Sequence, residues 1–167
     1  MNAEVWNDMS TLSDVETLTR LLLALACGVC LGLNRDLHHK PAGVRTFSLV
    51  SVGAALITLV AAQLLPGDTS SISRVIQGIL TGIGFVGAGV IFHGERGKSV
   101  AGLTTAAAIW FTAALGIACG LGRYALVVMG LVVALAVLVI GRPIERFAER
   151  LVKDRPPEAG DDGSPGV

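Results

Sequence analysis

Polar residues that could act together lie at the ends of two long apolar runs. Asn34-Arg35-Asp36 closes the first run, and Gly43-Val44-Arg45-Thr46 opens the second. An antiparallel helical hairpin would bring these two ends within reach of each other. Two interpretations are open. The basic residues set the topology and touch lipid phosphates, or Asp36 and Arg45 form a polar lock at the cytoplasmic mouth of a bundle.

A second polar group opens the fourth apolar run. Gly102-Leu103-Thr104-Thr105 stands there, and Trp110 follows in the middle of the run. The threonine hydroxyls either bond backbone carbonyls of their own helix, or they face Asp36 or the glycines of the third run across a cytoplasmic cavity. Because Trp110 is far from both ends of the run, we expect its N–H to have an internal partner. The candidate binding cluster is therefore Arg35, Asp36, Arg45, Thr46, Thr104, Thr105 and Trp110.

Glycines are the third feature of interest. The segment from Gly82 to Gly87 matches GxGxxG, but the dinucleotide motif needs a preceding strand and an acidic residue further on, and a neutral apolar run supplies neither. The glycines let neighbouring helices pack closely, or the third helix opens around a small ligand or ion. The glycines expected in one of these roles are Gly28, Gly32, Gly78, Gly82, Gly84, Gly87, Gly89 and Gly102.

Side chains for catalysis or metal binding do not occur in a recognisable pattern. There is no GxSxG or HExxH motif, and no acidic pair lies inside an apolar run. Cys27, Cys30 and Cys119 all lie in apolar runs and are interpreted as small packing residues. The histidines, which are His38, His39 and His93, lack the spacing of a metal site. We predict a protein that is not an enzyme and has no metal and no cofactor.

The distribution of charge indicates a membrane protein. Of 167 residues, 52% are hydrophobic and 16% are charged, and the charges form short clusters between long neutral runs. Soluble domains carry about 25% charged residues. The formal net charge of zero gives no reason to expect nucleic-acid binding.

Five runs approach the roughly 20 residues that a membrane-spanning helix needs. Ser13 to Glu16 reads as a capping box for the first helix, and Arg20 is expected to extend towards the lipid headgroups. The spans are Ser13 to Arg35, Thr46 to Leu65, Val75 to about His93, and two spans within Ser99 to Gly141 that a hairpin at Gly120-Leu121-Gly122-Arg123 separates. The predicted fold class is all-α, a polytopic membrane helical bundle with five transmembrane helices.

The chain is divided into four predicted parts. They are a periplasmic segment at 1–12, the five-helix domain at 13–141, a short cytoplasmic amphipathic helix at 142–154 and a disordered tail at 155–167. The acidic N-terminus lacks the features of a cleavable signal peptide. Basic residues concentrate in the first and third connections and after the last span, which places the N-terminus outside and the C-terminus in the cytoplasm.

Four blocks in order carry a family resemblance. They are Gly32-Leu33-Asn34-Arg35-Asp36, Lys40 to Thr46, Gly82 to Gly89, and Gly102 to Ala107 with Trp110. This pattern resembles the membrane domain of the MgtC/SapB family of bacterial inner-membrane proteins, over about Asp14 to Gly141. The family usually has glutamates at the positions of Asn34 and Asp36. Its virulence-type members also carry a soluble C-terminal domain, which we do not expect here.

The resemblance implies a multi-pass inner-membrane protein linked to growth at low magnesium. Better-known members are thought to restrain the F-type ATP synthase through membrane contacts. The leading hypothesis is a non-enzymatic protein in ion homeostasis or regulation, which contacts the lipid bilayer and another membrane protein, and forms a homo-oligomer. The alternative is a subunit of an oligomeric ion or small-molecule transporter or channel. An intramembrane enzyme would need a catalytic set that the sequence does not contain.

Overall fold

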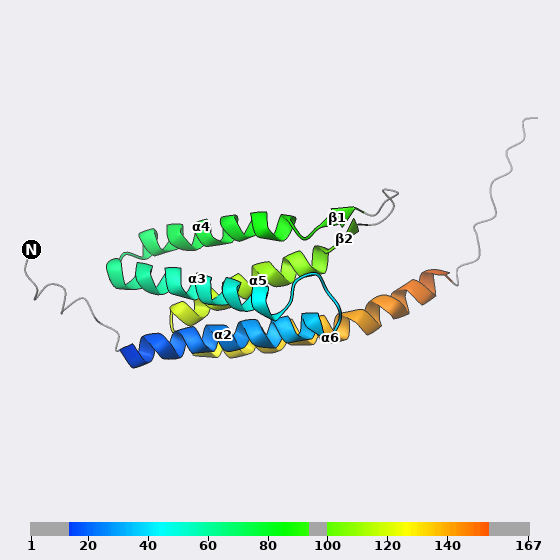
Figure 1. Ribbon diagram of the computed structural model, residues 1–167, viewed down its shortest axis with the longest axis horizontal. Helices are drawn as coiled ribbons and strands as arrows, with labels where there is room; N and C mark the ends of the chain where they lie inside the picture. The colour runs from blue at the N-terminus through cyan, green and yellow to red at the C-terminus, as the bar shows by residue number, and fades with distance from the viewer. Residues whose placement is uncertain (1–13, 94–99, 154–167) are drawn as a thin grey trace, which may run out of the picture. The chain divides into compact units, whose positions relative to one another are not determined.

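The computed structural model describes residues 14–93 and 100–153, with side chains at 14–91, 101–141 and 143. The predicted segments 1–12 and 155–167 and the residue Ser13 lie outside the described residues. The elements in chain order are α2 (Asp14–Asp36), α3 (Val44–Leu64), α4 (Thr69–Ala88), β1 (Phe92–His93), β2 (Val100–Ala101), α5 (Leu103–Gly120) and α6 (Tyr124–Lys153) (Figure 1).

Five helices in the described residues are long and apolar enough to cross a membrane. They are α2 to α5 and the part of α6 from Tyr124 to Gly141. The prediction of an all-α bundle with five spans is thus confirmed. The described residues fall into two compact units that divide between Leu135 and Ala136, so α6 begins in the first unit and continues in the second.

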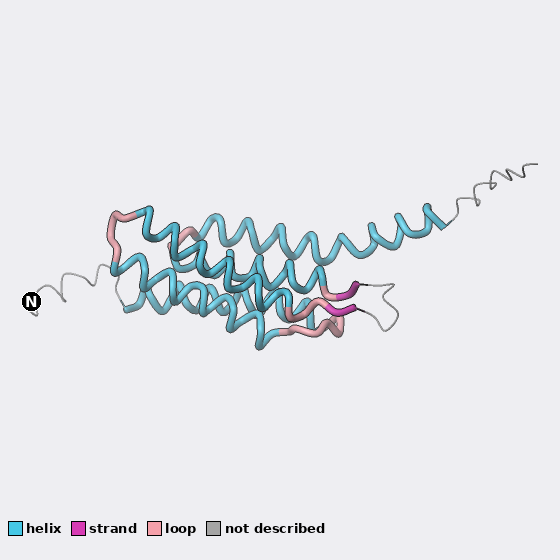
Figure 2. Tube along the Cα trace, turned by 90° about the horizontal axis from the view of Figure 1, so that it is seen from above, coloured by secondary structure: helices cyan, strands magenta, loops and turns pink. Residues whose placement is uncertain are grey.

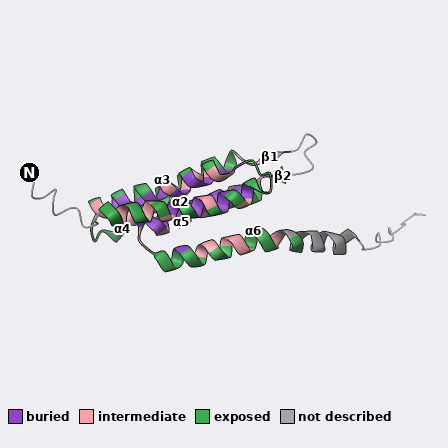
Figure 3. Ribbon diagram, turned by 60° about the horizontal axis from the view of Figure 1, so that its bottom comes forward, coloured by how far each residue is buried: buried purple, intermediate pink, exposed green. Residues whose placement is uncertain are grey.

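The interior of the first unit lies among α2, α3 and α5, and α3 packs extensively on both of the other two (Figure 3). Phe47, Leu59 and Ile109 are fully buried there, whereas most of α4 is exposed. On its inner side, α4 packs against the cluster of Ala54, Ala113 and Ile117 through partly buried branched side chains. In a bilayer these exposed apolar faces contact lipid chains or another protein, because the hydrocarbon core contains no water.

The start of α4 differs from the prediction. The helix begins at Thr69, ahead of the predicted Val75, because the Asp68 side chain accepts a hydrogen bond from the Ser71 N–H at 3.0 Å. This N-cap stabilises the first turn of α4. The sequence analysis left that turn out of the span because its residues are polar. Hydrogen bonds from Ser71 and then Ser70 also hold the pKa of the Asp68 carboxyl below its usual value.

Between α4 and α5 the chain forms a two-residue antiparallel pair, which the sequence did not predict (Figure 2). Phe92 pairs with Ala101, and His93 pairs with Val100. The third span was expected to reach about His93, but α4 ends at Ala88. The reason is local, since Gly87 and Gly89 flank that end and glycine weakens a helix.

The turn between α5 and α6 agrees with the predicted hairpin. Helix α5 ends at Gly120, and Gly122 has a φ of +66°, which favours glycine. Helix α6 then continues to Lys153 with Pro143 inside it, whereas the sequence predicted a break at Gly141-Arg142-Pro143 followed by a separate helix. Proline removes one hydrogen bond of a helix and leaves those of the other turns in place.

Candidate functional site

Arg35 is the central charged residue of the predicted cluster. It lies in the last turn of α2 with only 3% of its surface exposed. Its Nη2 donates a hydrogen bond of 2.7 Å to Oγ1 of Thr105, a buried residue in the first turn of α5. A buried guanidinium needs such partners because desolvation is expensive, and its place at the C-terminal end of α2 suits the helix dipole.

The hydrogen bond of Thr105 matches neither of the two alternatives that the sequence left open for the threonines. Thr58 and Thr112 bond carbonyls of their own helices, those of Ala54 and Ala108, each at 2.7 Å. The Thr105 hydroxyl instead accepts from Arg35 on another helix. The sequence identified both members of this pair but did not predict that they would meet.

Asp36 points at the start of α3. Its Oδ2 accepts a hydrogen bond of 3.0 Å from the backbone N–H of Val44. A Cβ at Gly43 would lie 1.6 Å from the Asp36 Oδ1, so a larger residue at position 43 would displace the carboxylate from this position. Asp36 therefore satisfies an N–H at the first turn of α3 that would otherwise lack a helical partner.

Arg45 does not take part in this contact. In the described part of the chain an ion pair joins Arg20 to Glu16, whereas Asp36 bonds the backbone of α3, which does not support the alternative of a lock between Asp36 and Arg45. Arg45 and Thr104 are exposed, and Thr46 is half-buried. Trp110 is 45% exposed, and its indole forms no hydrogen bond with the described part of the chain, contrary to the expected internal partner.

The glycines fall into two groups according to what a side chain would meet. In the interior they are positions of close approach: a Cβ at Gly28 would lie 2.5 Å from the Ser48 Cα, and one at Gly32 would lie 2.5 Å from the Val44 Cα. On α5, a Cβ at Gly116 would lie 2.2 Å from the Ser51 carbonyl oxygen. These glycines let the backbones of α2, α3 and α5 come into contact.

The glycines of α4 behave differently. A Cβ at Gly78, Gly82 or Gly84 would meet nothing within 4 Å. Gly87 is buried, and a Cβ there would lie 3.6 Å from Ala106, an ordinary contact. Gly78 and Gly82 of α4 therefore face open space. The glycine pairs of the other two helices, Gly28 with Gly32 on α2 and Gly116 with Gly120 on α5, lie against a neighbouring helix.

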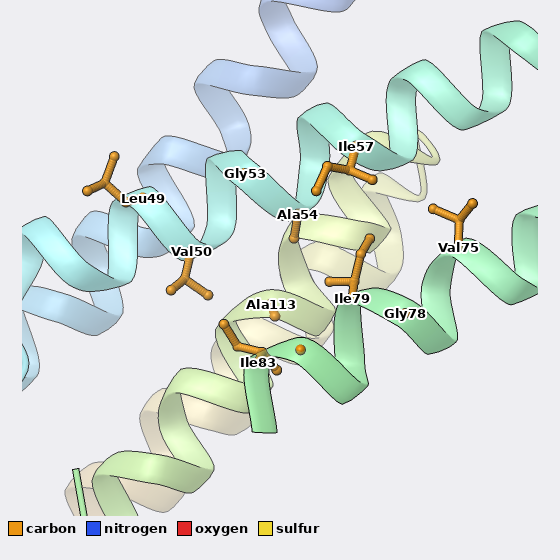
Figure 4. A pocket seen from close by; sticks show the side chains of 11 residues that line it. Leu49, Val50, Gly53, Ala54, Ile57, Val75, Gly78, Ile79, Ile83 and Ala113 are labelled. Atoms are coloured by element: carbon orange, nitrogen blue, oxygen red, sulfur yellow. The ribbon is translucent and has the colours of Figure 1, made fainter. Parts of the chain in front are cut away.

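Gly78 and Gly82 line a groove of about 510 Å³ between α3 and α4, with α5 at its base (Figure 4). Its other lining residues are Leu49, Val50, Gly53, Ala54, Ile57, Val75, Ile79, Ile83 and Ala113. None of them carries a charge or a polar side chain. Asp36, Arg45 and Thr104 are absent from this lining, so the groove is separate from the polar cluster around Arg35.

The opposite end of α2 carries a contact that the sequence did not predict. Arg20 Nη1 donates a hydrogen bond of 2.8 Å to the Gly120 carbonyl, and its Nη2 pairs with Glu16. Arg20 was expected to extend to the headgroups. It turns inward because the carbonyls at the C-terminal end of α5 lack helical partners and attract a cation.

The sequence matches the MgtC family over residues 21–147. The chain belongs to the MgtC family. The four motif blocks thus lie within one family domain, and the fold described above is that of a multi-pass MgtC-family membrane protein.

Several relatives of this MgtC-family chain are similar over most of its length. Protein SrpB of Synechococcus elongatus (strain ATCC 33912 / PCC 7942 / FACHB-805) is 42% identical over 161 residues, which cover 84% of this chain and 88% of SrpB. Protein MgtC of Brucella abortus (strain 2308) is 39% identical over 87% of this chain and 57% of that protein. "Putative magnesium transporter YhiD" of Escherichia coli (strain K12) is 42% identical over 74% of this chain and 59% of YhiD.

The chain therefore spans most of SrpB but less than two thirds of MgtC and YhiD. No solved structure matches it. The described residues of this MgtC-family chain have two separate features that could serve its function. One is a buried polar contact that joins α2 and α5, and the other is an apolar groove on the outside of α3 and α4.

Proposed function

We propose that this chain is a non-enzymatic regulator in the bacterial inner membrane, which acts in magnesium or other ion homeostasis by helix–helix contact with a membrane partner. The observation that supports this best is the open glycine face of α4. Gly78 and Gly82 leave room for a helix of another protein, whereas the interior glycine pairs already hold neighbouring helices of this chain.

The chemistry of the groove favours a helical partner over an ion. A hydrated cation needs oxygen ligands, and the groove is lined by aliphatic side chains and glycines. The family membership and the relative named for magnesium transport support the link to magnesium. The F-type ATP synthase is our proposed partner, in line with the family resemblance, and a second copy of this chain is the other candidate.

The glycine face can be tested by filling it. Because a Cβ at Gly82 meets nothing within 4 Å, we expect Gly82→Leu to fold normally but to prevent close approach of a partner helix. A host that needs this protein for growth at low magnesium should then lose that growth. The matched control is Gly84→Leu, which also has open space but does not line the groove.

Cross-linking in native membranes identifies the partner directly. A photoreactive residue at position 78 should capture a specific membrane protein, and Gly82→Leu should reduce the captured amount at least several-fold. Equal capture and equal growth for the variants at positions 82 and 84 would contradict a role for this face.

A transporter or channel subunit is the second candidate, favoured by the name of the Escherichia coli relative. Purified protein in lipid vesicles distinguishes the two. If the vesicles show magnesium flux and Gly82→Leu abolishes it, while cross-linking recovers only copies of this chain, the regulatory proposal fails.

A further inference from the structure

Two serine hydroxyls in the first half of α3 are buried without a protein partner. Ser51 is fully buried, and Ser48 is 9% exposed. Their Oγ atoms form no hydrogen bond with any part of the chain that the structure describes. A polar group inside a bilayer costs free energy unless something within the protein bonds it. Two such groups in one helix therefore need a common explanation.

The buried threonines show how a hydroxyl in this interior can be satisfied locally. Thr58 and Thr112 each donate to a carbonyl of the preceding turn of their own helix, at 2.7 Å. Ser48 and Ser51 also lie within a regular helix, where the same bond is available to a hydroxyl. Their hydroxyls do not make that bond with the described chain, so they are directed away from the carbonyls of α3.

The two serines share one face of α3, and their spacing suits a single bridging molecule. Side chains at this helical spacing begin about 5–6 Å apart, and a water with hydrogen bonds of about 2.8 Å can join oxygens up to roughly 5.5 Å apart. The face is turned to the interior, because Gly28 of α2 lies against the Ser48 Cα and Gly116 of α5 lies against the Ser51 carbonyl. The carbonyl oxygens of Phe47 and Ser51 lie at these contacts and can complete the partners that a buried water needs.

We propose that Ser48 and Ser51 hold a buried water molecule among α2, α3 and α5. The charges around the serines indicate a neutral ligand. The part of α2 between Arg20 and Arg35, the part of α3 after Arg45 and the whole of α5 contain no charged residue. A cation held by these oxygens alone would lack an opposing charge, which burial makes costly. Water satisfies both hydroxyls and links α3 to the helices against which it packs.

Contact with water is measured first on the unaltered full chain, isotopically labelled and reconstituted in lipid bilayers. In water-edited solid-state NMR, magnetisation passes from water to the carbons that lie near it. We expect the Cβ signals of Ser48 and Ser51 to build up several-fold faster than those of Thr58 and Thr112, which are also buried but bond their own helices. Equal build-up rates for the four residues would overturn the proposal.

Alanine variants then test the bridge through stability. Ser48→Ala and Ser51→Ala should each lower the unfolding temperature in detergent by about 2–4 °C, because either change leaves the water with too few partners. The double variant should be no less stable than the weaker single variant, since the bridge is lost only once. Hydroxyls without any ligand would give the opposite sign, and alanine variants more stable than the wild type would contradict the proposal.

Thr58→Val is the matched control, because Thr58 is buried on the same helix and bonds the Ala54 carbonyl. Its effect should add to that of Ser48→Ala, since no shared water joins the two. If the effects of Ser48→Ala and Ser51→Ala add in the same way, the two hydroxyls act separately and the bridge is wrong. An unfolding temperature that rises with sodium chloride but not with choline chloride would mean that a cation occupies the site, which contradicts a neutral ligand.

Discussion

At the scale of single residues, the buried Arg35 defines the polar end of the bundle. A guanidinium that is 3% exposed must have its donors satisfied from inside the protein, and Thr105 supplies one acceptor from a helix far along the chain. Asp36, its neighbour, works differently, because it is exposed and closes the connection to α3 through the Val44 N–H. Two adjacent charged residues thus hold α2 to two different helices.

The hydroxyl of Thr105 is the more sensitive part of this arrangement. We expect Thr105→Val to reduce the free energy of unfolding by about 2 kcal/mol, since hydrogen bonds to charged groups are worth roughly 1.5–3 kcal/mol. Thr105→Ser keeps the acceptor and should lose much less. Thermal unfolding in detergent measures both, and equal stability of the two variants would show that the hydroxyl is unimportant.

At the scale of helices, glycine has opposite effects in different places. Inside the bundle it removes a side chain for which no space exists, as at Gly116 against the Ser51 carbonyl. On α4 the glycines form a surface that no other part of the described chain contacts. Branched side chains such as Ile79 and Ile83 pack α4 against its neighbours instead. The same small-xxx-small sequence pattern therefore marks a packed helix–helix contact on α2 and α5, and an unoccupied surface on α4.

Alanine at the two kinds of site should separate these roles. Gly116→Ala should destabilise the protein by about 1–3 kcal/mol, because the added methyl must displace a backbone carbonyl. Gly78→Ala should stabilise it by about 0.5–1 kcal/mol, since alanine is the better helix former and its Cβ meets nothing.

Unfolding temperatures of the two proteins in the same detergent provide the measurement. A similar loss for both variants would mean that the Gly78 face is already in tight contact, which would contradict the open groove.

Hydrophobic periodicity and turn residues were enough to predict the helical elements, but not all of their ends. The five apolar runs and the Gly120 to Arg123 hairpin depend on local composition, and they were predicted correctly. The early start of α4 and the course of α6 through Pro143 were missed, because a cap or a proline changes a helix by only a few bonds that neighbouring turns can outweigh.

At the scale of the whole molecule, partners between helices could not be read from the sequence. Membership of the cluster was predicted for Arg35 and Thr105, yet their contact depends on how each helix is rotated about its axis. The same holds for Arg20 with Gly120. Composition shows that a residue is inside a span, but only the packed bundle shows which neighbour it meets.

Orientation is a prediction for the whole molecule, since charge in the short connections sets it. We expect the connection with Lys40 to face the cytoplasm and the connection with Asp68 to face the periplasm. In a Cys30→Ser background, Lys40→Cys should resist a membrane-impermeant maleimide in intact cells, and Asp68→Cys should react. The reverse labelling pattern would overturn the N-out orientation.

The contact between Arg35 and Thr105 also has a consequence for biosynthesis. The two residues are separated by 70 positions, so the ribosome makes Thr105 on the order of ten seconds after Arg35. During that interval α2 already has its apolar length, but α5 does not exist to shelter the guanidinium. The Arg35 end of α2 must therefore wait at the membrane surface in contact with water or headgroups, and it becomes enclosed only when α5 inserts beside it. Insertion of the later helices, and not of α2 itself, is the step that completes this part of the interior.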